Sequence, residues 1–302
     1  MPFSLSLEAV RPYVRKVENS VENLKQLILI SFDFLIKSDY YIYIEFIYSF
    51  IQSYLLKIMQ SKFNQNGRIL FEGVSPLTGQ KIVCIITGLK TSTSNEKTGD
   101  MLQTWILLQD HKPNEAHKNG LNRGVCGDCP HAGYNNGSCY VKWFQAPLQV
   151  WKSYKAGRYD YFSNSDLNLI KGRSLRMGSA GDPTMIPLSV WEPLLNECKS
   201  HTGYSHQYRH DFAIDFKNVL QASCDTFDDY LYASDLGFNC FLVKHKDTKA
   251  PKGFINCPAS IEAGKKTSCE LCSMCSGSGS KRGKNIYINA HGNTAKYVPV
   301  IA

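Results

Sequence analysis

Short apolar runs, separated by glycine, proline and polar residues, fill the chain from Gly67 onward. Two of these runs, at residues 82–86 and 103–108, are short and almost continuously apolar, which predicts buried β-strands. The loop between them, residues 91–100, is rich in serine, threonine, asparagine and glycine. This pattern predicts either a hairpin or a pair of edge strands.

Later apolar runs alternate with helical stretches, which is typical of βα units. We therefore predict an α/β fold with a largely parallel sheet or a partial (β/α) barrel. The expected strands in this part of the chain are residues 174–177, 203–208, 231–233, 240–243, 254–256 and 286–289. Ligands in such folds bind beyond the carboxyl ends of the strands, so the residues that follow each strand are the candidate functional residues.

The first part of the chain has a different pattern. Residues 27–59 are dense in isoleucine, phenylalanine, tyrosine and leucine, but charged residues such as Asp33, Lys37 and Glu45 interrupt them. The longest interval without a charge is about half of the roughly 20 residues that a membrane-spanning helix needs. We predict a helical N-terminal appendage over residues 1–66, with no membrane span, and a cysteine-rich α/β metal-binding domain over residues 67–302. A membrane-surface role is the alternative for the appendage.

The length and composition of the chain help to decide whether its cysteines form disulfides or bind metal. The chain has 302 residues, eleven cysteines and a formal net charge of +8. Disulfide scaffolds are usually short secreted chains, and the first residues here lack the pattern of a cleaved signal peptide. We therefore expect a cytoplasmic protein whose cysteines are metal ligands rather than disulfides.

The first candidate metal site is Cys126, Cys129 and Cys139. Two cysteines that are separated by two residues can direct both sulfurs to one metal, and nearby glycines allow the backbone to wrap closely around it. His131 as a fourth ligand would complete a zinc site, whereas three cysteines alone would leave one iron of a cubane open. Buried thiols without a metal are the alternative.

The second candidate site has four cysteines: Cys257, Cys269, Cys272 and Cys275. The repeated two-residue spacing is similar to that of ferredoxin-type cluster loops, which favours a 4Fe-4S cluster over zinc. The remaining cysteines stand singly in apolar or helical surroundings and are expected in the core. They are Cys84, Cys198, Cys224 and Cys240.

A strand that runs into a glycine turn is expected between the two cysteine sets. It presents Gly181 and Asp182, and an apolar helix follows Pro183. Asp182 is either a ligand for an ammonium, hydroxyl or metal, or a helix cap. Arg176, on the same strand, either binds a phosphate or carboxylate or forms a structural salt bridge.

Histidines and a second carboxylate complete the candidate site. Four histidines stand near expected strand ends, and we predict that one of them lines the site and acts in catalysis, with His206 as the candidate. The other three are His201, His210 and His291. Asp235 follows the strand expected at residues 231–233, so it is a second candidate catalytic carboxylate.

A cysteine-rich loop that ends in Cys139-Tyr140, followed by a strand and Gly181-Asp182-Pro183, resembles radical S-adenosylmethionine enzymes. The resemblance implies that three cysteines hold a cluster and that Asp182, with Gly181 and Arg176, binds S-adenosylmethionine. A second likeness covers residues 68–292. The stretches NEKTGDMLQTWIL, CGDCPHA, LRMGSAGDP, CPASIEAGKKTSCELCSMC and INAHG are similar to an uncharacterised cysteine-rich family of bacteriophages, prophages and plasmids. That likeness implies a mobile-element origin and the cytoplasm of a host cell.

Two functions follow from these patterns. The first is an iron–sulfur enzyme with a catalytic cluster on the first cysteine set and an auxiliary cluster on the second. The second is a structural zinc protein that binds phosphate or nucleic acid. Its binding surface would be the basic stretch 244–284, with nine Lys or Arg against three Asp or Glu, together with Tyr204, Tyr208 and Arg209.

Overall fold

The computed structural model of the chain describes residues 64–91, 95–133, 138–264 and 266–290, together with four helical residues at positions 48, 49, 51 and 52. The chain divides into two units, Met1–Ser61 and Lys62–Ala302. Apart from those four residues, the helices expected in the N-terminal appendage lie outside the described residues. Within the described residues, no helix has both the length and the apolar character needed to cross a membrane.

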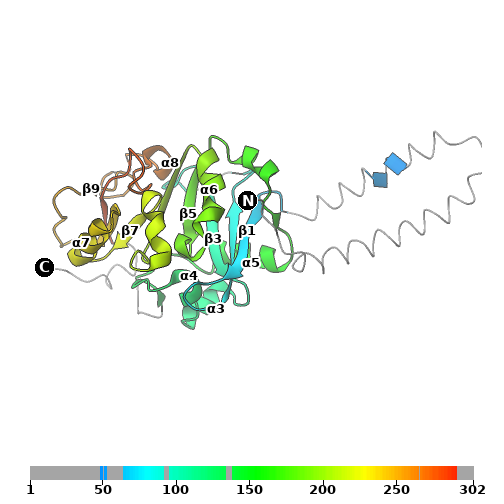
Figure 1. The fold of residues 1–302 in the computed structure, drawn as a ribbon, viewed down its shortest axis with the longest axis horizontal. Helices are drawn as coiled ribbons and strands as arrows, with labels where there is room; N and C mark the ends of the chain where they lie inside the picture. The colour runs from blue at the N-terminus through cyan, green and yellow to red at the C-terminus, as the bar shows by residue number, and fades with distance from the viewer. Residues whose placement is uncertain are drawn as a thin grey trace, which may run out of the picture. The chain divides into compact units, whose positions relative to one another are not determined.

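Ten strands of the second unit form one mixed sheet, in the order β4-β1-β2-β3-β5-β6-β7-β8-β10-β9 (Figure 1). The strands are β1 (Gly67–Val74), β2 (Lys81–Thr87), β3 (Leu102–Leu108), β4 (Asp160–Tyr161), β5 (Ser174–Ala180), β6 (Ser200–Ser205), β7 (Gln221–Cys224), β8 (Cys240–Lys244), β9 (Ile255–Asn256) and β10 (Ile286–Asn289). Strand β2 pairs antiparallel with β1 and β3, and every other pair is parallel. The predicted α/β fold with a largely parallel sheet is confirmed.

Helical segments connect most of the successive parallel strands. A parallel pair needs a crossover connection between its strands, and this connection is usually helical. The α-helices are α3 (Pro113–Lys118), α4 (Arg123–Cys126), α5 (Ala146–Lys155), α6 (Leu188–Glu197), α7 (Phe227–Asp235) and α8 (Cys269–Cys272). The 3-10 helices are η2 (Asn164–Leu169), η3 (Pro183–Met185) and η4 (Asp211–Asn218). Because η3 and α6 link β5 to β6, η4 links β6 to β7 and α7 links β7 to β8, the carboxyl ends of these strands meet at one edge of the sheet.

Both faces of β2 are buried, which explains its continuous apolar sequence. On one face Cys84 and its neighbours pack in a cluster with Trp191 of α6. On the other face Val83 and Ile85 pack in a cluster with Val150 of α5. Helices therefore cover the sheet on both sides, and β2 and β3 form the predicted hairpin inside the sheet rather than at its edge.

Trp191 fastens α6 to the turn that follows β5. Its side chain has no exposed surface, and its Nε1 donates a hydrogen bond of 3.1 Å to the carbonyl oxygen of Pro183. We expect Trp191→Phe to lower the free energy of unfolding by about 1–3 kcal/mol, because it removes one of the two hydrogen bonds to this carbonyl oxygen and leaves a cavity in the core. Urea denaturation followed by circular dichroism measures this; an unchanged midpoint would contradict the anchoring role.

Most of the predicted later strands are present, but one prediction is wrong. Strands β5, β8, β9 and β10 confirm four of the predicted runs, and the run predicted at 203–208 is instead β6, at Ser200–Ser205. Residues 231–233 lie in α7 and not in a strand. Thr226 starts that helix, because its side chain and that of Asp229 cap each other's backbone amides. The neighbouring strand is β7, whose short sequence QASC gave no apolar run to detect.

Candidate functional site

The two cysteine sets line one cavity of about 360 Å³ that lies over one face of the parallel strands and reaches their carboxyl ends. Its lining includes Asp182 after β5, His206 after β6, Ser223 of β7 and Asn289 of β10. All seven predicted cysteine ligands are part of this lining: Cys126, Cys129, Cys139, Cys257, Cys269, Cys272 and Cys275. The fold therefore brings residues from four loop segments, up to 149 positions apart in the sequence, to one cavity.

The thiols of the first set interact electrostatically with one another. Burial raises the pKa of the Cys126 thiol well above its usual value, and the nearby charges of Cys129 and Cys139 raise it further. Burial also raises the pKa of Cys139, and Cys129 adds to that shift. Each thiol thus disfavours the ionisation of its neighbours, so three thiolates need a compensating positive charge.

The side chain of Gln207 joins the first cysteine loop to the end of β6 through two hydrogen bonds. Gln207, which is fully buried, donates from Nε2 to the carbonyl oxygen of Cys126 at 3.1 Å. Its Oε1 accepts from the backbone N–H of Asp128, also at 3.1 Å. Gly127 between them has a φ of 58°, and a Cβ there would lie 2.3 Å from the Gln207 side chain. The glycine of the Cys-Gly-Asp-Cys motif is therefore required for this close contact.

The thiols of the second set also interact electrostatically with one another. Burial raises the pKa of Cys275 and also that of Cys269, and for both thiols the charges of Cys257 and Cys272 add to the shift. Helix α8 carries Cys269 and Cys272 and ends at Ser273, which adopts a left-handed φ of 53°. The turn at Ser273 leads the chain directly to Cys275.

Backbone hydrogen bonds attach the second loop to earlier parts of the fold. The N–H of Cys269 donates to the carbonyl oxygen of Lys97, in the loop between β2 and β3, at 2.8 Å. The carbonyl oxygen of Cys275 accepts from the N–H of Gly203 in β6 at 3.0 Å. The second loop is therefore fixed to the loop before β3 and to the middle of β6, whereas the first is fixed to the end of β6.

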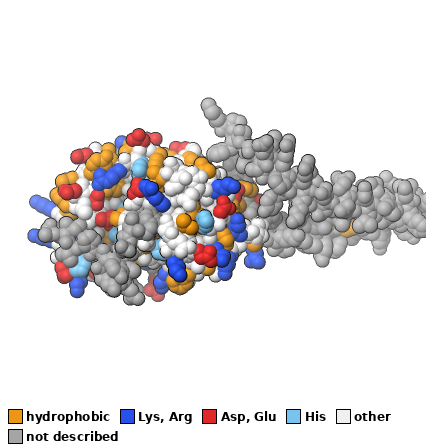
Figure 2. Space-filling view, turned by 90° about the horizontal axis from the view of Figure 1, so that it is seen from below, with side chains coloured by type: hydrophobic (Ala, Val, Ile, Leu, Met, Phe, Trp, Pro, Cys, Tyr) orange, Lys and Arg blue, Asp and Glu red, His pale blue; other side chains and the backbone are white. Residues whose placement is uncertain are grey.

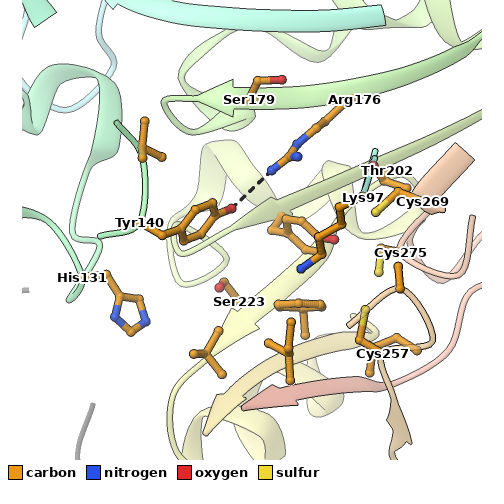
Figure 3. A pocket seen from close by; sticks show the side chains of 18 of the residues that line it. Lys97, His131, Tyr140, Arg176, Ser179, Thr202, Ser223, Cys257, Cys269 and Cys275 are labelled. Atoms are coloured by element: carbon orange, nitrogen blue, oxygen red, sulfur yellow. Dashed lines mark hydrogen bonds between the residues drawn. The ribbon is translucent and has the colours of Figure 1, made fainter. Parts of the chain in front are cut away.

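Two cations lie in the cavity between the sets. In Figure 3 the side chains of Arg176 and Lys97 point between His131 on one side and the cysteines of the second set on the other. Arg176 Nη2 donates to the hydroxyl of Tyr140 at 3.3 Å. The charge of Arg176 lowers the pKa of Cys269, although burial raises it more. Arg176 was predicted either to bind a phosphate or carboxylate ligand or to form a structural salt bridge. Within the described residues, it forms no salt bridge to a carboxylate.

The glycine turn after β5 has the expected form. Gly181 has a φ of 80°, and a Cβ there would lie 2.5 Å from the carbonyl oxygen of Ile106, so only glycine fits. Pro183 begins η3 directly after the turn, and the apolar helix α6 follows. The carboxylate of Asp182 is thereby held at the wall of the cavity.

Asp182 acts as a cap within the protein. One carboxylate oxygen accepts from the Thr184 backbone N–H at 3.0 Å and from the Thr184 hydroxyl at 2.8 Å. The other accepts from the Ser205 hydroxyl at 3.1 Å and from the His206 N–H at 3.0 Å. Burial raises the pKa of Asp182, and these hydrogen bonds oppose the shift. Four donors occupy the acceptor sites of the carboxylate, so its contacts are with β6 and η3 rather than with a ligand.

The two histidines of the cavity converge on a residue that the sequence patterns did not identify, Asp225. His131 does not face the cysteines: its Nε2 lies 2.5 Å from Asp225 Oδ1, and its Nδ1 lies 2.5 Å from the Ser138 hydroxyl. His206 Nε2 lies 3.2 Å from Asp225 Oδ2. Burial would lower the pKa of His206, but nearby Cys129 and Asp225 raise it well above its usual value. His206, and not His131, is therefore the histidine beside the first cysteine set.

Other candidates lie elsewhere. Asp235 is exposed at the end of α7 and is not part of the cavity lining, because the strand that was expected to carry it is a helix. His201 contacts the carbonyl oxygen of Val219 at 3.0 Å, and His210 contacts Asp128 at 2.9 Å, so both have structural partners. His291 lies outside the described residues.

The four single cysteines pack with apolar side chains. Cys84, Cys224 and Cys240 have no exposed surface, and Cys198 is partly buried beside the cluster that contains Trp191. None of the eleven cysteines forms a disulfide. The cysteines of this chain therefore fall into two cavity sets and four core positions, without disulfides.

Comparisons with known proteins found no match: no family model, curated protein or solved structure matches this chain.

Proposed function

We propose that this chain is an iron–sulfur protein of mobile-element type that acts as a radical-S-adenosylmethionine-like enzyme in the cavity between its two cysteine sets. The observation that carries the proposal is the convergence of seven cysteines, none of them in a disulfide, on one cavity that reaches the carboxyl ends of the parallel strands. In α/β folds this edge of the sheet is where ligands bind.

Electrostatics support metal ligation at both sets. Burial and mutual repulsion raise the thiol pKa values of Cys126, Cys139, Cys269 and Cys275. Buried thiols in such groups ionise only when a strong positive charge is supplied, and a coordinated metal supplies it. Among the core cysteines, Cys84 and Cys198 have no thiol neighbour that shifts their pKa, and Cys224 and Cys240 form only a buried pair, in which Cys240 raises the pKa of Cys224.

The spacing of the sulfurs supports a cluster over a single zinc ion. Tetrahedral zinc with Zn–S bonds of about 2.3 Å places its sulfur ligands about 3.8 Å apart. Among the described residues, the one group of three possible ligand atoms within 4.8 Å of one another contains no cysteine. No three sulfurs of either set meet this criterion, whereas a 4Fe-4S cubane, with its thiolates on different irons, holds its ligands farther apart than one zinc ion does.

The two clusters would have different roles. Cys126, Cys129 and Cys139 would hold three irons of the first cluster, which leaves the fourth iron open to S-adenosylmethionine. That cofactor would supply radical chemistry when bound. The second set, with four cysteines, would hold a closed auxiliary cluster, beside which Arg176 and Lys97 offset negative charge. Asp182 would position His206 at the first cluster rather than bind the cofactor itself, because its acceptor sites are filled.

Anaerobic purification tests this proposal. We expect a brown protein that absorbs near 400 nm and carries about eight irons and eight acid-labile sulfides per chain, because each cubane contains four of each. Metal analysis and the absorption spectrum give the result. A colourless protein that contains zinc would overturn the iron–sulfur proposal, and iron–sulfur protein that fails to cleave S-adenosylmethionine after reduction would overturn the enzymatic part.

The zinc and nucleic-acid alternative has less support. Tyr208 is only 3% exposed, and the guanidinium of Arg209 forms an ion pair of 2.6 Å with Asp229. Tyr204 lines the cavity between the cysteine sets. On the face in Figure 2, positive and negative side chains are interspersed, so that face offers no uniformly basic surface. Metal analysis decides between the two functions.

A further inference from the structure

We propose that His131, His206 and Asp225 form a separate site for one divalent first-row transition metal, next to the first cysteine set. It goes beyond the proposed function, because it needs neither an iron–sulfur cluster nor S-adenosylmethionine. Three observations carry it: the convergence of the ligand atoms, the charge of the site and its open side.

The three side chains converge from different elements. His131 belongs to the first cysteine loop, His206 follows β6, and Asp225 follows β7. One ligand atom from each lies within 4.8 Å of the others. The Nε2 atoms of the two histidines face different oxygens of the same carboxylate, at 2.5 and 3.2 Å. Two imidazoles and one carboxylate are a ligand set that binds divalent iron and similar metals.

The charge of this group favours a cation. The Asp225 side chain is 14% exposed, and both of its oxygens face imidazole nitrogens. In the part of the chain that the structure describes, the two histidines are the only ion-pair partners of this carboxylate. Asp225 supplies a negative charge to the group, and a metal ion that displaces the protons of the two imidazoles would keep this carboxylate paired with positive charge.

The ligands are held in place by their surroundings. The Ser138 hydroxyl contacts Nδ1 of His131, which fixes the ring with Nε2 toward Asp225. The backbone N–H of Asp225 donates to the side chain of Asp229 at 3.1 Å, within the cap of α7. Asp225 thus stands at the junction of a strand and a capped helix, and the site is preorganised.

The open side of the site faces the cavity. His131 and His206 are part of the cavity lining, whereas Asp225 is not, so the carboxylate lies behind the two rings. Three protein ligands leave coordination positions free, and these positions face the space between the cysteine sets. A metal here would act as a Lewis acid on an oxygen or nitrogen of a substrate in the cavity.

Cobalt(II) titration of the full-length, anaerobically purified protein tests the site. We expect one Co²⁺ per chain beyond the metal already bound, with visible d–d bands and without the near-ultraviolet charge-transfer band of cobalt–thiolate bonds. Asp225→Asn, which preserves the shape of the side chain, should weaken this binding by about tenfold or more. His131→Gln is a second variant with the same expected effect, in case Asp225→Asn folds poorly.

The matched control is His210→Gln. His210 pairs with Asp128 at 2.9 Å, as a histidine–aspartate pair outside the cavity lining, and this variant should bind Co²⁺ like the wild type. The proposal is overturned if no additional Co²⁺ binds, if all of it shows thiolate bands, or if both site variants bind as tightly as the control. Iron and sulfide contents of the same samples test the cluster proposal separately, so the two failures are distinguishable.

Discussion

Cys139→Ala is expected to remove about half of the protein-bound iron and all reductive cleavage of S-adenosylmethionine. The first set has only three cysteines, and Cys139 is the one supplied by a separate segment, so its loss leaves two ligands for a cubane that needs at least three from the protein. The second set does not share this residue and should keep its cluster. Iron and sulfide analysis, together with electron paramagnetic resonance of the reduced protein, measures both effects.

Cys198→Ser is the control for this experiment. Cys198 is a partly buried thiol whose sulfur contacts the carbonyl oxygen of Leu195 at 3.6 Å, away from the cavity lining. This variant should keep the full iron content and the wild-type spectrum. If Cys139→Ala also keeps all of its iron, the assignment of the first set as a cluster site is wrong.

Asp182→Ala should lower the free energy of unfolding by about 3–5 kcal/mol. The substitution removes an acceptor that serves four donors, and it leaves the buried N–H groups of Thr184 and His206 without partners. Each buried donor that loses its partner costs about 1–3 kcal/mol. Because Asp182 joins the end of β5 to the end of β6, we also expect a lower iron content in the first set. Chemical denaturation and iron analysis give the two results.

Two further variants make this test specific. Asp182→Asn keeps one acceptor oxygen and should lose less stability than alanine. Asp128→Ala removes an exposed carboxylate that pairs with Arg123 and His210, and such surface pairs contribute about 1 kcal/mol or less. If Asp182→Ala is no more harmful than Asp128→Ala, the capping role that the contacts indicate would have to be abandoned.

The sequence predicted the parts of the fold that carry strong local patterns. The apolar runs that became β2 and β3 are long enough to be detected without tertiary information, and Ile286–Asn289 forms a strand with the predicted bounds. The glycine turn at Gly181 and the helix after it also follow from local chemistry. In the site, the spacing of the cysteines was sufficient to predict that Cys126 and Cys257 belong to two different groups.

Other features depend on contacts that no local pattern contains. Strand β7 has the polar sequence QASC, and it is buried only because β6 and β8 flank it. Without that strand, Asp225 had no predicted position at the sheet edge, and the carboxylate was sought at Asp235 instead. His131 stands two residues after Cys129, so its orientation toward Asp225, 94 positions later, follows from tertiary packing.

The backbone bond between Cys269 and Lys97 also affects how this protein matures. The loop that anchors the second set is synthesised early, but the cysteines that dock on it come about 170 residues later, so this part of the cavity wall stays incomplete until they have been made. Contacts between such distant segments form slowly. If the proposed function holds, the second set would be loaded only after Cys275 has been synthesised, whereas Cys126 and Cys129, three positions apart, could capture metal earlier.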